Sequence, residues 1–233
     1  MASNSPFTRA RLHVADASRI IPSRYDLPPV LDPLAEVAPG GLDAVNELDA
    51  ATNPRFTRDR PCLRQRDFLL PDNELLQSHI VNGAFAHGSP HARFSSPSCG
   101  VWYSSDSTDG AQAEVAFHKG LELADLGERA AEHYPQRIRY TEWLAAYSGS
   151  LDVLNASAPE SAAILDPVSY LVSQALGENL RNGGSLGFVY PSVRNPDTTN
   201  HAIFIPAVVA DVRLARHWEL TLDATGGAWD GAA

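Results

Sequence analysis

From about residue 80 onward, short apolar runs alternate with turn-forming residues, a pattern typical of strands and helices that pack together. CGVWYSS, SLGFVYPS and HAIFIPAVV predict strands, because aromatic and β-branched residues are bounded there by glycine, proline or polar residues. QRIRYTEWLAAYSG and SLDVLN predict two more strands, joined by a turn at SGS. Strands outnumber helices, so the sequence predicts an α+β fold, with a mixed or antiparallel sheet and helices packed on it.

Two segments carry the apolar stripe typical of a helix that packs on one face. STDGAQAEVAFHKGLELADLG predicts a helix that Ser107, Thr108 or Asp109 can cap and that Gly127 can end. LDPVSYLVSQALGENLRNGG predicts a second helix, with Asp166 as its N-cap and Gly183 at its end. We expect one face of this second helix to be buried, namely Val168, Leu171, Val172, Ala175, Leu176 and Leu180.

The first 60 residues differ from the rest of the chain. IPSRYDLPPVLDPLAEVAPGG holds five prolines and a Gly-Gly pair, which favours an irregular segment lying on the surface. GLDAVNELDAAT, which follows, predicts one short amphipathic helix. We therefore expect residues 1–60 to be an N-terminal extension that packs on a domain formed by residues 61–233, the two making one structural unit.

The formal net charge of −10 makes nucleic acid an unfavourable direct ligand, although a local arginine can still bind a small phosphorylated ligand. No apolar run approaches the roughly 20 residues that cross a membrane, and no secretory signal is visible. The two cysteines, Cys62 and Cys99, are too few for a disulfide scaffold and lack CxxC spacing. We expect free thiols, no membrane contact and a cytoplasmic location.

The stretch HARFSSPSCGVWYSSDSTDGAQAEVAFH places Arg93, Tyr103 and Glu114 among small, apolar and turn-forming residues. Arg93 is either a surface residue whose stem packs on apolar neighbours or a guanidinium that grips a phosphate or carboxylate. Tyr103 is either a packing aromatic or a flat face for a heteroaromatic ring. Strand alternation predicts that Trp102 and Tyr103 point to opposite faces of their strand.

Glu114 is either a solvated residue near a helix N-terminus or a carboxylate that stabilises an oxocarbenium ion on a sugar. His118, one helical turn later, can pair with it, but no third ligand is evident, so we expect no metal site. Ser192, in GFVYPSVR, is either a turn residue or a hydroxyl that hydrogen-bonds a ligand. It lies in no GxSxG motif, and the chain carries neither a GxGxxG nor a P-loop pattern.

Together, Arg93, Glu114 and Ser192 resemble the signature of the RES domain family, which is named for an Arg, a Glu and a Ser. Further segments are similar to that family in the same order: RIIPSRYDLPP, LDAATNPRF, GAFAHGSPHARFS, GVWYSS, AEVAFH, YLVSQALGENLRNGG and GFVYPSVR. The resemblance covers residues 19–220. The sequence departs from the pattern after GFVYPSVR, where His201 stands in a place that is often a Cys in the family.

The resemblance implies a fold similar to the ADP-ribosyltransferase toxins and an activity that destroys NAD+. It places Arg93, Tyr103 and Glu114 in an NAD+ pocket, with Ser192 close by, and it implies no metal and no resident cofactor. NAD+ is then the substrate, and its nicotinamide–ribose bond is broken by hydrolysis, or by phosphorolysis with inorganic phosphate as co-substrate. The implied partner is a helical DNA-binding antitoxin that covers the cleft, in a toxin–antitoxin pair.

Two other functions remain open on the sequence. The same pocket would serve a protein ADP-ribosyltransferase, in which a protein side chain replaces water or phosphate as the acceptor. The acidic composition and the altered loop NPDTTNH are also compatible with a non-catalytic binding module whose NAD+ pocket is degenerate. A homodimer is a further possibility that the sequence leaves open.

Overall fold

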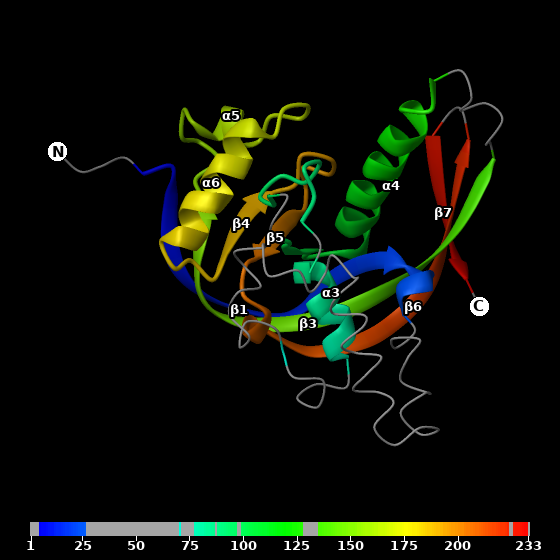
Figure 1. Cartoon of the computed structure of the whole chain (residues 1–233), viewed down its shortest axis with the longest axis horizontal. Helices are drawn as coiled ribbons and strands as arrows, with labels where there is room; N and C mark the ends of the chain where they lie inside the picture. The colour runs from blue at the N-terminus through cyan, green and yellow to red at the C-terminus, as the bar shows by residue number, and fades with distance from the viewer. Residues whose placement is uncertain are drawn as a thin grey trace, which may run out of the picture.

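A computed structural model of the chain describes residues 5–26, 70, 77–86, 88–96, 99–127, 135–223 and 226–232. Within these residues, seven strands form one mixed sheet and four α-helices pack on it, which confirms the predicted α+β fold (Figure 1). The strands are β1 Phe7–Pro22, β2 Trp102–Ser105, β3 Gln136–Leu154, β4 Gly187–Pro191, β5 Thr199–Ile203, β6 Val209–Asp223 and β7 Gly226–Ala232. The helices are α3 Ser78–Ala86, α4 Thr108–Ala124, α5 Ser161–Ile164 and α6 Leu171–Asn182.

The strand order is β1-β2-β5-β4-β3-β6-β7, and β1 also pairs with β3. The β3–β4 pair is parallel and all other pairs are antiparallel. The long strands β1, β3 and β6 form a curved ribbon under the shorter strands (Figure 1). The predicted turn at SGS is wrong: β3 runs straight through Ser148–Ser150, because His13, Leu12 and Arg11 of β1 pair with those three residues.

Part of the predicted N-terminal extension is a strand of this sheet. β1 pairs with β3 from Phe7 opposite Leu154 to Pro22 opposite Tyr140. The proline-rich stretch beyond Asp26 and the short helix predicted at GLDAVNELDAAT lie outside the described residues. The boundary near residue 60 therefore stays a prediction.

The two faces of the sheet are covered by different helices. One face packs on α3, and its buried cluster includes Phe85, Trp102, Trp143 and Ile203. The other face packs on α4, through Ala111 and Leu123, and on α5 and α6, where Phe94, Phe188 and Tyr190 lie. Tyr103 belongs to this second face, so the prediction that Trp102 and Tyr103 point to opposite faces is confirmed.

The helix α6 exists, but its predicted start and buried face are wrong. It begins at Leu171, because the Asp166 side chain accepts the N–H groups of Val168 and Ser169 and caps a separate turn. Val168 is 88% exposed and Leu171 is 76% exposed, and of the predicted face only Leu180 is buried. The helix instead turns Gly177 toward the Phe94 carbonyl, where an added Cβ would stand 2.5 Å from the oxygen. Close backbone approach therefore overrides the apolar stripe.

The structure bears on the expected free thiols and on the expected lack of membrane contact. Cys99 is disulfide-bonded, so the expectation of a free thiol is wrong for this residue. Cys62 lies outside the described residues. No helix in the described ranges combines the length and the apolar character that a membrane span requires.

Candidate active site

The helix α4 carries Glu114 toward the end of β4. Its N-cap is Ser107, whose side chain accepts the Gly110 N–H, and the helix continues to Ala124, close to the predicted ends. Gly110 lies so close to the sheet that an added Cβ would stand 2.2 Å from Ser105 Oγ and 2.7 Å from Thr198 Oγ1. This glycine therefore lets the helix approach the sheet, and Glu114 follows one turn later on the side of the β4–β5 loop.

One oxygen of the Glu114 carboxylate is held by two donors. Ser192 Oγ donates to Glu114 Oε1 at 3.0 Å, and Asn200 Nδ2 donates to the same oxygen at 2.8 Å. The second oxygen, Oε2, lies 4.0 Å from His118 Nε2, and the side chain keeps 29% of its surface exposed. Glu114 therefore presents one fixed oxygen and one oxygen without a close donor among the described residues.

The Ser192 hydroxyl is fully used within this arrangement. It donates to Glu114 and accepts the N–H groups of Arg194 and Asn195, at 3.2 Å and 3.1 Å. A hydroxyl has one donor hydrogen and two acceptor lone pairs. Ser192 therefore couples the carboxylate to the β4–β5 loop and has no spare hydrogen for a further acceptor.

Asn200 was not found by the sequence analysis. It lies on β5 between Ser105 of β2 and Tyr190 of β4, and only 3% of its surface is exposed. Its neighbours Thr199 and His201 are polar and it directly precedes the predicted strand HAIFIPAVV, so no local pattern marked it as a buried group that requires a partner. Its Oδ1 has no hydrogen-bond partner among the described residues.

Arg93 is buried, with 8% of its surface exposed, so it is not the surface arginine of the simpler interpretation. Its Nη1 donates to the carbonyl oxygens of Ile164 and Asp166, both at 2.9 Å. Its Cζ lies 4.7 Å from the centroid of the Tyr170 ring. The guanidinium is thus held by neutral groups only: two carbonyl oxygens at the end of α5 and just after it, and the ring of Tyr170 just before α6.

Tyr103 touches the residue next to Arg93. Its hydroxyl oxygen accepts the Phe94 N–H at 3.1 Å, and its partly buried ring packs on the cluster around Phe94 and Tyr190. Burial raises the pKa of Tyr103 well above its ordinary value, so the phenol stays neutral. The observed contacts of Tyr103 are those of a residue that fixes the backbone beside Arg93.

Tyr190 lies between the two parts of the site, because it packs in one cluster with Tyr103 and pairs across the sheet with Asn200, which donates to Glu114. Burial raises the pKa of Tyr190, Glu114 and Tyr103 raise it further, and Arg93 opposes them. His118 lies in the same field: burial lowers its pKa, Glu114 raises it, and Arg194 and Arg93 lower it. The structure therefore brings all four predicted residues to one region, between α4 and the α5–α6 segment.

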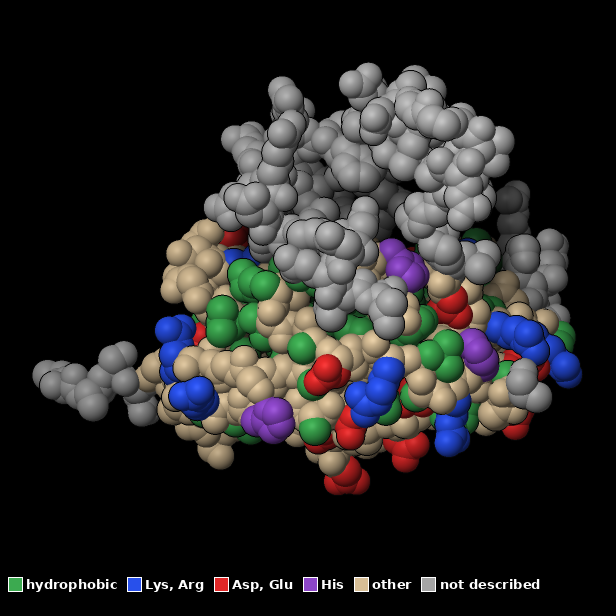
Figure 2. Space-filling model, turned by 90° about the horizontal axis from the view of Figure 1, so that it is seen from below, with side chains coloured by type: hydrophobic (Ala, Val, Ile, Leu, Met, Phe, Trp, Pro, Cys, Tyr) green, Lys and Arg blue, Asp and Glu red, His purple; other side chains and the backbone are tan. Residues whose placement is uncertain are grey.

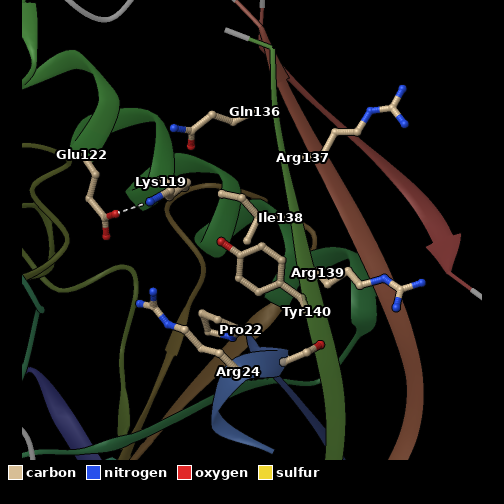
Figure 3. Close-up of a pocket in the computed structure, with 10 residues that line it drawn as sticks. Pro22, Arg24, Lys119, Glu122, Gln136, Arg137, Ile138, Arg139 and Tyr140 are labelled. Carbon is tan, nitrogen blue, oxygen red and sulfur yellow. Dashed lines mark hydrogen bonds and ion pairs between the residues drawn. The ribbon is translucent and has the colours of Figure 1, made fainter. Parts of the chain in front are cut away.

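Two other features lie apart from this region. His201 faces the opposite side of the sheet, where its ring lies 5.3 Å from that of Tyr147, so the departure from the family pattern is not in the cluster. A cavity of about 620 Å³ opens between α4 and the start of β3, and contains none of the four predicted residues. Figure 3 shows Arg24, Tyr140 and the Lys119–Glu122 ion pair around it, whereas Arg137 and Arg139 extend from the other side of β3.

No group of three or more His, Cys, Asp and Glu side chains in the described ranges is arranged to hold a metal ion. The chemistry available to the cluster is that of a carboxylate, guanidinium groups and neutral hydrogen-bonding side chains. Such a set can bind an anionic ligand and stabilise a positive charge that develops close to Glu114.

The cluster lies inside the part of the chain that matches a known protein family. The model of the RES domain family matches residues 74–223, a range that contains Arg93, Tyr103, Glu114 and Ser192. A solved structure, the MbcT–MbcA toxin–antitoxin complex of M. tuberculosis, aligns with 56% of this chain and 71% of that one, at 15% identity and a TM-score of 0.37. No curated protein sequence is significantly similar to the chain. Because the family model matches more than half of the chain, the protein belongs to the RES domain family.

Proposed function

We propose that this protein cleaves the nicotinamide–ribose bond of NAD+, by hydrolysis or phosphorolysis, as the toxin of a toxin–antitoxin pair in the cytoplasm. The observation that carries the proposal is the state of Glu114. Two buried donors fix Oε1, and Oε2 remains open beside them. A carboxylate held in this way can face a positive charge at one defined position.

The reaction breaks the bond between ribose C1′ and the nicotinamide nitrogen. The electron pair stays on that nitrogen and gives neutral nicotinamide, while positive charge develops on C1′ and the ring oxygen. Glu114 Oε2 would stabilise this oxocarbenium-like transition state and contact the ribose hydroxyls. Water or phosphate then forms the new bond to C1′, and the proton of the acceptor passes to solvent.

The other residues would bind and position the substrate. Arg93 would hold a phosphate or ribose oxygen, because its guanidinium is already oriented by two carbonyl groups. Tyr103 would offer its ring to nicotinamide or a neighbouring ring. Ser192 would orient Glu114, a role that its saturated hydrogen bonds support over direct contact with a phosphate.

The first test is incubation of the purified protein with NAD+, with and without inorganic phosphate, beside the Glu114→Gln variant. We expect nicotinamide release with the native protein and a loss of at least about a thousandfold with the variant. The mass of the sugar product, ADP-ribose or its phosphate ester, identifies the acceptor. Labelled NAD+ that ends in a protein band would identify a protein acceptor instead. No NAD+ loss with the native protein would overturn the proposal and favour a binding module.

An exposed apolar patch beside the cluster supports a protein partner. Val168 and Leu171 lie just after Pro167, whose carbonyl contacts the β4–β5 loop. Such a patch is typical of a protein interface, and we infer that a helical antitoxin covers it. Val168→Glu with Leu171→Glu should release a co-purified antitoxin and leave NAD+ cleavage by the free protein unchanged. Retention of the antitoxin would place its interface elsewhere.

A further inference from the structure

Arg194, on the β4–β5 loop, is held firmly next to the cluster. Its Nη2 donates to the Pro167 carbonyl at 2.6 Å and to the Tyr170 hydroxyl at 3.3 Å, and its Cζ lies 3.3 Å from the centroid of the Phe117 ring. Its backbone N–H donates to Ser192 Oγ, the same oxygen that donates to Glu114. Arg194 therefore spans from α4 to the segment before α6 and is linked to the carboxylate through one hydroxyl.

The guanidinium of Arg194 resembles that of Arg93 in its surroundings. Both contact Tyr170, Arg93 through the face of the ring and Arg194 through the hydroxyl. Both donate to main-chain carbonyls, and neither forms an ion pair with a carboxylate in the described part of the chain. The nearby Asp166 carboxylate accepts backbone N–H groups instead.

The absence of a carboxylate partner matters because these two guanidiniums lie next to the same tyrosine, Tyr170. Arg9, Arg137 and Arg213 are each paired with a carboxylate. On the face beneath the long strands, basic side chains also lie beside acidic ones (Figure 2). In addition, Arg194 Nε is buried without a hydrogen-bond partner among the described residues. Arg93 and Arg194 are thus two fixed guanidiniums beside one tyrosine, and no described carboxylate pairs with either, so together they favour an anion with more than one phosphate.

We propose that Arg194 and Arg93 form a clamp on the two sides of Tyr170 that recognises a diphosphate joining two nucleosides. This inference rests on the proposed function and adds to it a residue, Arg194, that determines substrate specificity. If Glu114 faces the nicotinamide ribose, the diphosphate begins one ester bond away from that sugar. A mononucleotide has one phosphate and would satisfy one guanidinium only. Arg194 would therefore make the enzyme prefer a dinucleotide to nicotinamide mononucleotide.

The test compares kcat/KM for NAD+ and for nicotinamide mononucleotide in the native protein, Arg194→Met, Arg194→Lys and the control Arg216→Met. The methionine keeps an apolar stem against Phe117, and Arg216 also lies over an aromatic ring, that of Trp218 on β6. We expect Arg194→Met to lower kcat/KM for NAD+ by about 100-fold, mainly through KM, and that for the mononucleotide by less than about fivefold. Arg194→Lys should restore part of the preference, and Arg216→Met should change neither substrate.

An equal loss for both substrates, or an unchanged ratio, would overturn the clamp and leave Arg194 as a brace between α4 and Tyr170. Calorimetry with inorganic pyrophosphate and inorganic phosphate decides the question without turnover. We expect the native protein to bind pyrophosphate at least about tenfold more tightly than Arg194→Met does, and phosphate nearly equally. Pyrophosphate binding that depends on Arg194, without NAD+ cleavage, would support the clamp and contradict the proposed reaction. NAD+ cleavage together with pyrophosphate binding that does not depend on Arg194 would support the proposed reaction and contradict the clamp.

Discussion

The region around Glu142 and the region around Glu114 both hold a carboxylate beside α4, but only one of them leaves an oxygen open. Glu142, on β3, is 2% exposed. Its Oε1 accepts from Ser18 Oγ and Thr108 Oγ1, both at 2.7 Å, and its Oε2 accepts from Trp218 Nε1 at 2.9 Å. Glu114 has the same number of donors on Oε1 and none within hydrogen-bond distance of Oε2 among the described residues.

The difference separates a structural carboxylate from one that can act on a ligand. Glu142 joins β1, β6 and the first turn of α4 to β3, because its three donors come from those elements. Such a carboxylate stabilises the fold and has nothing left to offer a substrate. At Glu114 both donors bind Oε1, so the carboxylate is fixed while Oε2 stays available to a ligand. The number of carboxylate oxygens already engaged in hydrogen bonds therefore distinguishes the two roles better than burial or residue type does.

The same substitution at the two sites should give opposite results, and the larger effect is on activity. Glu114→Gln keeps an acceptor for Ser192 and Asn200 but removes the negative charge from the open position. We expect kcat to fall by about a thousandfold or more, with a melting temperature within about 2 °C of the native value. Turnover that survives within a few-fold of the native rate would show that the charge is not needed.

Glu142→Gln should instead act on stability. The new amide group would replace Oε2 and point its hydrogens at the Trp218 N–H, leaving two donors face to face in a buried place. We expect the free energy of unfolding to fall by about 3 kcal/mol in a urea titration, with kcat/KM of the folded protein within about twofold of the native value. Native stability would mean that the closed carboxylate is dispensable.

His201 is a buried titratable group on the face of β5 opposite Asn200. Burial lowers its pKa from 6.5 to about 4. The unfolded state therefore binds more protons between these values, and stability falls as the pH falls from 6.5 toward 4. At pH 5 the loss amounts to about 2 kcal/mol.

Urea unfolding of the native protein and of His201→Val at pH 7, 6, 5 and 4.5 measures this effect as a difference. The valine variant lacks the titrating group and fits a strand position. We expect the native protein to lose about 2 kcal/mol relative to the variant between pH 7 and pH 5, because only the native protein carries the titrating imidazole. Parallel curves would show that His201 is protonated without cost in the folded state.

The sequence predicted β2, β4, β5 and α4 because each is short or clearly amphipathic and is bounded by turn residues. It missed β6, whose charged residues alternate with small and apolar ones, because that strand is held by its pairing with β3. It also divided β3 at SGS, because the continuity of β3 there depends on its pairing with β1. Arg93, Tyr103, Glu114 and Ser192 were accessible through their resemblance to a family. Asn200 and Arg194 were not, because their importance depends on β5 lying under α4 and on the loop reaching Tyr170.

The smallest effects are those of single substitutions at Ser192 and Asn200, and they test whether the two residues share one task. Each donates to Glu114 Oε1, so either alone can hold that oxygen, whereas their joint removal frees the carboxylate. We expect Ser192→Ala and Asn200→Ala each to lower kcat by about tenfold and the double variant by about a thousandfold, more than the product of the single losses. Ser192→Thr, which keeps the hydroxyl, should retain most of the activity. A loss of only about a hundredfold in the double variant would mean that the two donors act independently. A single Ser192→Ala loss as large as that of Glu114→Gln would assign Ser192 a direct part in the chemistry, which its saturated hydrogen bonds argue against.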